Sequence, residues 1–108
     1  MKTATRSRQG ITIVDVVGPI DLESSPALRR TLLDALKTVD RLAVNLTEVK
    51  YIDSSGIASL LEALKAAKQA GKRFLLFGLT VGVRQVLQLT RLTGIFDIRE
   101  TEEEAVNA

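Results

Sequence analysis

The chain has 108 residues, with 15 basic and 13 acidic side chains and a formal net charge of +2. This length predicts one domain, residues 1–108, and so balanced a charge gives no reason to expect a nucleic-acid partner. The absence of histidine and cysteine excludes a Ser-His-Asp triad, a thiolate nucleophile and a cysteine-ligated zinc site. We therefore expect a protein that is not an enzyme and that carries no metal or cofactor.

The first two predicted strands differ in strength. Residues 3–8 are polar and threonine-rich and predict at best a weak edge strand, whereas the isoleucines and valines of residues 11–17 predict a strong one. Gln9-Gly10 between them is typical of a turn. Ser24-Ser25-Pro26 then predicts the start of a helix, with a serine as its cap and the proline in its first turn. Apolar residues at helical spacing continue it as far as Val39.

The rest of the chain alternates in the same way. Strands are predicted at residues 42–46, 73–77 and 95–98, and helices beginning at Asp53-Ser54-Ser55-Gly56, at Thr80 and at Thr101. The longest uncharged apolar stretch, residues 74–83, is too short to span a bilayer, and the first residues lack the apolar segment of a signal peptide. These features predict a cytoplasmic protein without membrane insertion.

This order of elements predicts the α/β class. Two strands followed by repeated helix–strand units imply a small mixed β-sheet with parallel central strands, helical crossovers and about four helices. In such sheets the functional loops tend to leave the C-terminal ends of the strands. Asp21 and Asp53 both lie in loops of that kind, so adjacent strands would bring them close together.

The segment Tyr51-Ile52-Asp53-Ser54-Ser55-Gly56 is the most informative part of the chain. It places two hydroxyls at a helix N-terminus, where free backbone N–H groups and a partial positive charge favour an anion. We expect the fold to tolerate a phosphate on Ser54, which would add about −1.5 to −2 charges beside Asp53. A partner packed on this surface would then meet a buried, uncompensated anion, so phosphorylation would abolish binding.

Two other interpretations use the same residues. Asp, Ser and Gly at a helix start are also ordinary caps and turn formers. Asp15, Asp21 and Asp53 could form an acidic metal cluster like that of phosphate-accepting receiver domains, although Asp15 falls inside a predicted strand. A catalytic serine is disfavoured, because no histidine activates Ser54 or Ser55 and no nucleophile-elbow glycine precedes them.

Four segments of the chain resemble the STAS domain family, which takes its name from sulfate transporters and anti-sigma factor antagonists. They are Gly18-Pro19-Ile20-Asp21, Ala43-Val44-Asn45-Leu46, Tyr51-Ile52-Asp53-Ser54-Ser55-Gly56-Ile57 and Leu92-Thr93-Gly94-Ile95-Phe96. They occur in the family's order over nearly the whole chain, and the Asp-Ser-Ser-Gly segment is the most specific of them. Within the family the chain looks like a free-standing anti-sigma factor antagonist.

The resemblance implies a role in partner switching, which regulates sigma-factor-dependent transcription. Such antagonists, when unphosphorylated, bind an anti-sigma factor that is also a serine kinase of the histidine-kinase-like ATPase fold. That kinase phosphorylates the first serine of the motif, here Ser54, and a PP2C-type phosphatase removes the phosphate. Asp21 and Asp53 match family acidic positions beside the phosphoserine, and Ser55 and Gly56 match the helix start.

The expected partner-binding surface consists of residues 53–56, the following helix start and the Asp21 loop. Ser59 and Glu62, which we expect to be exposed, would extend it along the helix. Pro19 and Leu22 lie in the variable part of the first motif and are expected to affect partner choice rather than chemistry. Related single-domain members scaffold stress-sensing complexes or bind the ATPase of a lipid-transport machine. A STAS subunit of that kind, acting without phosphorylation, is the alternative.

Overall fold

The computed structural model describes all of residues 1–108 and contains five strands and four helices. In chain order they are β1 (Lys2–Arg8), β2 (Ile11–Val17), α1 (Ser25–Leu36), β3 (Arg41–Glu48), α2 (Ser54–Gln69), β4 (Arg73–Phe77), α3 (Val81–Leu89), β5 (Asp97–Arg99) and α4 (Glu102–Val106). The strands form one sheet in the order β1-β2-β3-β4-β5. Strand β1 is antiparallel to β2, and the other neighbours are parallel. The predicted α/β class with a small mixed sheet is confirmed.

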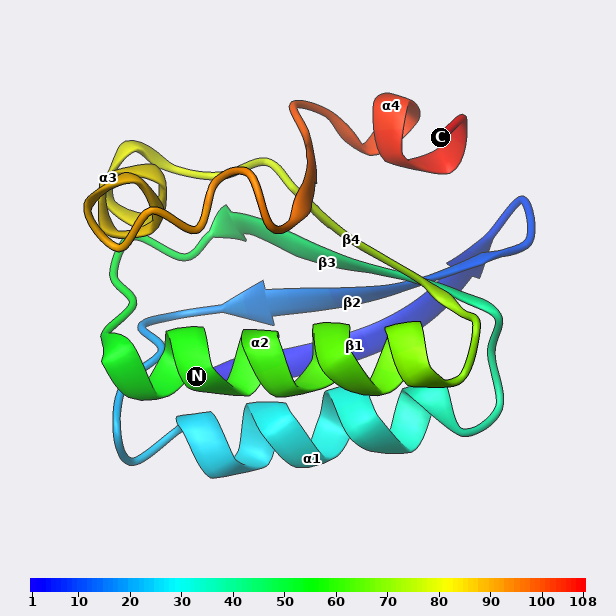
Figure 1. The fold of residues 1–108 in the computed structure, drawn as a ribbon, viewed down its shortest axis with the longest axis horizontal. Coiled ribbons are helices and arrows are strands. Elements are labelled where there is room, and N and C mark those ends of the chain that lie inside the picture. Colours follow the sequence, from blue (N-terminus) through cyan, green and yellow to red (C-terminus); the bar gives the residue numbers. More distant parts are fainter.

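The sheet separates two layers of helices. Helices α1 and α2 lie side by side on one face, the short α4 covers part of the other, and α3 lies at the end where β2 and β3 terminate (Figure 1). Residues on a strand alternate between the faces. In β3, Leu42 and Val44 therefore enter the larger core under α1 and α2. Ala43 between them enters the smaller core, which includes Ala105 and Val106 of α4.

Strand β1 is longer and more regular than the sequence predicted. It pairs with β2 over its whole length, from Lys2 opposite Val17 to Arg8 opposite Ile11. The turn between them explains this regularity, because Gln9 and Gly10 both have positive φ angles, of 49° and 81°. Such two-residue turns match the twist of a hairpin and fix its register. Backbone hydrogen bonds to β2 thus hold β1 in a strand, although its side chains are almost all exposed.

Two other predicted boundaries shift. Helix α1 ends at Leu36, and the chain turns back through a bond from the Thr38 N–H to the Ala35 carbonyl. Val39 therefore packs against the core from outside the helix. The last strand covers Asp97–Arg99 rather than residues 95–98, and Phe96 before it is buried in the larger core.

Candidate functional site

The loops that follow β2 and β3 are joined to each other by backbone hydrogen bonds. The Ile20 N–H donates to the Tyr51 carbonyl at 3.0 Å, and the Asp53 N–H donates to the Ile20 carbonyl at 3.1 Å. These bonds make a parallel bridge between Ile20 and Ile52, beyond the ends of the two neighbouring strands. The expected closeness of the Asp21 and Asp53 loops is confirmed.

Asp21 organises the first of these loops. Its Oδ1 accepts hydrogen bonds from the backbone N–H groups of Glu23 and Ser24, at 3.1 and 3.0 Å, and lies 3.1 Å from the Ser24 hydroxyl. Ser24 is the N-cap residue of α1, as predicted, but its side chain makes no capping bond. Its hydroxyl instead accepts from the Asp21 N–H at 2.9 Å.

Asp53 caps helix α2. Its Oδ1 accepts from the backbone N–H groups of Ser55 and Gly56, at 2.9 and 3.2 Å, and from the Ser55 hydroxyl at 2.5 Å. The bond from the Ser55 hydroxyl, followed by bonds from the N–H groups of Gly56, Ser55 and Leu22, lowers the pKa of the Asp53 carboxyl. Hydrogen bonds to the charged form stabilise it, so Asp53 is ionised at neutral pH.

The two serines of the motif are therefore in different states. The Ser55 hydroxyl is held by Asp53 and is only partly accessible, whereas Ser54, the first residue of α2, is exposed. The expectation of free amides at this helix start needs correction, because Asp53 already occupies the N–H groups of Ser55 and Gly56. A phosphate on Ser54 would lie beside an ionised carboxylate that already uses two of the nearest backbone donors.

Gly56 brings α2 against both loops. A Cβ atom on this residue would lie 2.6 Å from Ile20 Cγ2 and 2.6 Å from Ile52 Cγ1. Both isoleucines are buried, so they have little freedom to move away. The glycine predicted as part of the helix start is therefore required by packing, and it sets how closely Ser54 approaches the Asp21 loop.

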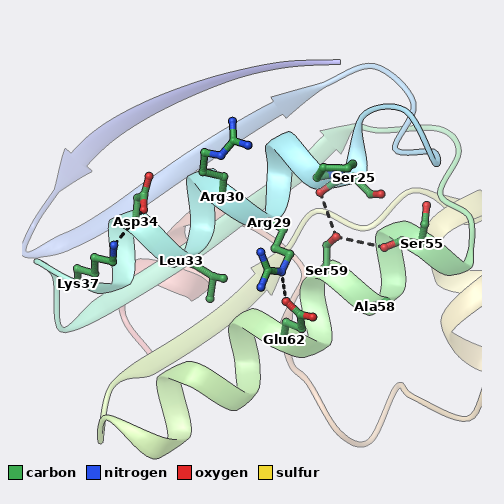
Figure 2. Close-up of a pocket in the computed structure, with 11 residues that line it drawn as sticks. Ser25, Arg29, Arg30, Leu33, Asp34, Lys37, Ser55, Ala58, Ser59 and Glu62 are labelled. Carbon is green, nitrogen blue, oxygen red and sulfur yellow. Dashed lines mark hydrogen bonds and ion pairs between the residues drawn. The ribbon is translucent and has the colours of Figure 1, made fainter.

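Ser59 is buried, and the prediction that it is exposed was wrong. Only 5% of the residue is accessible, because α1 packs across it. Its hydroxyl lies 3.1 Å from the Ser25 carbonyl and 3.2 Å from the Ser55 carbonyl. Figure 2 shows Ser59 pointing toward the first turn of α1. Ser59 thus ties the two helix starts together and cannot contact a partner directly.

Glu62 is exposed as predicted and forms an ion pair with Arg29 of α1. The pair crosses a groove of about 490 Å³ between α1 and α2 (Figure 2). Ser55 and Ser59 line the groove near the start of α2. Both members of the pair are about half exposed, so a partner that approaches along α2 can reach Glu62.

Asp15 does not join the other two aspartates. It lies within β2 and not in the loops, and there Arg6 of β1 donates to it at 2.7 Å and Asn45 of β3 donates at 2.8 Å. The Arg6 bond is the main reason that its pKa is lowered. The chain holds no group of three or more acidic side chains arranged for a metal ion.

No sequence motif indicated that Thr80 is linked to this site. Its side chain caps α3 as predicted, accepting from the Val83 N–H at 3.4 Å. It also donates to the Val49 carbonyl at 2.6 Å, which fastens the start of α3 to the loop before Tyr51. A threonine before an apolar run indicated the cap. Nothing near Thr80 in the sequence indicated its second bond, to a carbonyl 31 residues away.

This α/β fold has an exposed serine at the start of an aspartate-capped helix, where two parallel strands end, and it corresponds to a known protein family. The STAS domain family matches residues 2–105, and the chain belongs to that family, as the sequence resemblance predicted. No helix has the length and hydrophobicity needed to cross a membrane.

Individual relatives agree with the family assignment. The chain is 32% identical over 90 residues to a protein named anti-sigma-B factor antagonist from Listeria monocytogenes, covering 82% of this chain and 79% of the relative. Among solved structures, a putative anti-sigma factor antagonist from Thermotoga maritima superimposes with a TM-score of 0.91 at 24% identity, covering 97% of this chain and 92% of the other. The antagonist SpoIIAA in its unphosphorylated form gives a TM-score of 0.81 at 21% identity, covering 98% and 94%. These structures have the same fold.

Proposed function

We propose that this protein is an anti-sigma factor antagonist whose binding to an anti-sigma factor serine kinase is switched off by phosphorylation of Ser54. The observation that carries the proposal is the difference between the two adjacent serines. Ser54 is exposed at the start of α2, whereas the Ser55 hydroxyl is held by the Asp53 carboxylate. A kinase therefore finds one fully exposed hydroxyl in the motif, that of Ser54.

The relatives support the regulatory part of the proposal. Proteins about 30% identical to most of this chain, from Listeria monocytogenes and Bacillus subtilis, are named anti-sigma-B factor antagonists. SpoIIAA, which shares the fold, has been solved in both unphosphorylated and phosphorylated forms. We infer a regulatory binding protein and not an enzyme, acting in partner switching with a kinase and an opposing PP2C-type phosphatase.

The electrostatics of the site explain why a phosphate would act as a switch. Transfer of the γ-phosphoryl group of ATP to the Ser54 hydroxyl releases ADP and a proton and leaves a phosphate of about −1.5 to −2 charges. Asp53 is ionised beside it and already uses the N–H groups of Ser55 and Gly56. A partner surface that covered Ser54 would therefore bury a like-charged pair, which is strongly unfavourable.

Site-resolved mass spectrometry tests the proposal. The protein is incubated with ATP and each candidate serine kinase from the same genome, alongside Ser54→Ala and Ser55→Ala variants. We expect one phosphate, on Ser54, in the unaltered protein and in Ser55→Ala, and none in Ser54→Ala. The same kinase should bind the unphosphorylated protein and Ser54→Ala.

A second variant tests the switch itself. Ser54→Asp places a carboxylate at the first position of α2, where the helix dipole favours an acidic residue, so it should keep the fold. It should bind the kinase at least tenfold more weakly than Ser54→Ala. Unchanged binding would contradict the switch. A stable, ATP-independent complex with a transporter ATPase, together with no phosphorylation by any kinase, would favour the transport-subunit alternative.

A further inference from the structure

Three large apolar side chains are exposed at the end of the molecule that carries Ser54. Leu22 is 75% exposed, Tyr51 55% and Val81 74%. Leu22 and Tyr51 lie in the loops that follow β2 and β3, and Val81 is the first residue of α3, after β4. These three segments lie at the left end of the molecule in Figure 1. We call these three residues the apolar arc.

Contacts within the loops place the arc around the start of α2. Leu22 is two residues after Ile20, whose carbonyl accepts from the Asp53 N–H, and the Tyr51 carbonyl accepts from the Ile20 N–H. Val81 stands between two residues that touch the loop before Tyr51.

Those two residues are Thr80 and Gly82. The Thr80 hydroxyl donates to the Val49 carbonyl, and a Cβ on Gly82 would lie 2.3 Å from the Lys50 carbonyl oxygen. The beginning of α3 is therefore held directly against the segment that leads to the serine motif, with Val81 facing solvent.

The acidic side chains of the two loops keep their charge. Asp21 and Asp53 each accept backbone N–H groups of their own loops, and Glu23 and Lys50 beside the arc are exposed. An incoming surface therefore meets the Ser54 hydroxyl with both apolar side chains and charged groups around it. Any kinase that reaches this hydroxyl has to cover that neighbourhood.

From this arrangement we propose that the apolar arc of Leu22, Tyr51 and Val81 is the docking surface for the kinase that phosphorylates Ser54, which presents a complementary apolar surface. This inference rests on the proposed function. Apolar contacts beside Ser54 keep water away, so an added phosphate next to the ionised Asp53 costs more to bury there than it would in a wet interface.

The test uses the kinase found in the Ser54 phosphorylation assay. Leu22→Ser, Tyr51→Ser and Val81→Ser are compared with the unaltered protein for the Kd of the unphosphorylated complex and for KM and kcat at Ser54. Leu89→Ser is the matched control, because Leu89 is 84% exposed at the other end of α3. The unfolding midpoint of each variant shows that it is folded.

Each arc variant should raise Kd and KM by about tenfold, as truncation of a central interface residue does, and leave kcat unchanged. Leu89→Ser should behave like the unaltered protein. A second measurement combines each arc variant with Ser54→Asp. The loss of binding caused by the aspartate should be smaller in the arc variants, because their interface with the kinase stays wetter.

Three results would overturn the inference. Arc variants that bind and react like the unaltered protein would exclude the arc while leaving Ser54 phosphorylation standing. An equal loss of kinase binding in Leu89→Ser would show that exposed apolar residues contribute to binding wherever they lie on the surface. No phosphorylation of the unaltered protein by any kinase would remove the proposed function, and the inference with it.

Discussion

Gly56 is the position where the backbone of α2 most closely approaches the two loops of the site. A methyl group there would overlap Ile20 and Ile52, and overpacking of a buried site costs about 1–3 kcal/mol. We therefore expect Gly56→Ala to lower the free energy of unfolding by about that amount and to weaken kinase binding by shifting the loops apart. Urea unfolding followed by circular dichroism measures the first effect.

Gly94→Ala is the control for this substitution. Nothing lies within 4 Å of a Cβ at that position. Its stability should be unchanged or raised by up to about 1 kcal/mol, because alanine restricts the unfolded chain. If Gly56→Ala were as stable as Gly94→Ala, the close packing of the helix start would not be what holds the loops.

Ser59 offers a second single-residue test. Its hydroxyl is buried against the Ser25 and Ser55 carbonyls, and a hydrogen bond of this kind contributes about 0.5–1.5 kcal/mol. Ser59→Ala should lose roughly that much stability in urea unfolding and should still be phosphorylated at Ser54 with unchanged kcat. A normal stability together with a large loss of kinase binding would mean that Ser59 contacts the partner after all.

Helix α4 is fastened to the sheet by ion pairs. Arg6 of β1 donates to Glu102 at 3.1 Å and to Asp15 at 2.7 Å, and Arg8 donates to Glu102 at 2.6 Å. The hydrogen bonds from Arg6 and then Arg8 lower the pKa of Glu102 to about 2. Charged side chains at the edge of the sheet thus hold a helix of five residues, too short to be stable alone.

This network predicts how stability depends on pH. The folded-state pKa of Glu102 lies below its unfolded value of about 4.3. Its contribution is therefore complete above roughly pH 5 and is lost as the pH falls towards 2. Glu102→Gln should lower the unfolding midpoint at neutral pH and make its decline between pH 5 and 2 shallower.

Glu48→Gln provides the comparison, because Glu48 is an exposed carboxylate outside the network. Its acid dependence should match that of the unaltered protein. Equal pH profiles for Glu102→Gln and the unaltered protein would show that the Arg6 and Arg8 bonds do not persist in solution.

Across the whole chain, the spacing of apolar residues predicted most of the architecture. The isoleucines and valines identified β2, and short apolar runs identified β3 and β4. The capping signals at Asp53, Thr80 and Thr101 predicted three helix starts. Loops at the ends of neighbouring parallel strands then had to meet, which is why the pairing of the Asp21 and Asp53 loops was predictable.

The structural features that local sequence patterns did not predict depend on contacts between helices and strands. The burial of Ser59 follows from the packing of α1 on α2, and a small polar residue in a helix carries no sign of the neighbour that covers it. Strand β1 owes its regularity to the hairpin turn and to pairing with β2, since its own side chains are polar. The apolar arc brings together residues 22, 51 and 81, which are far apart in sequence.

The switch should act without rearranging the fold. Asp53 already holds the start of α2 through two N–H groups, so a phosphate on the neighbouring Ser54 has no bond to displace. In amide NMR spectra of the phosphorylated protein, we expect shifts confined to the two site loops and the first turn of α2. Shifts across α4 and β1 would indicate a conformational change and would contradict a switch based on charge alone.

The order of the strands in the sheet, which follows their order in the chain, has a consequence for how the protein is made. A chain emerging from the ribosome can add each new strand to the one before it, with no need to wait for a distant segment. The bonds of Arg6 and Arg8 to Glu102 and Glu103 join residues 94 to 96 positions apart, so they can form only after nearly the whole chain has been made.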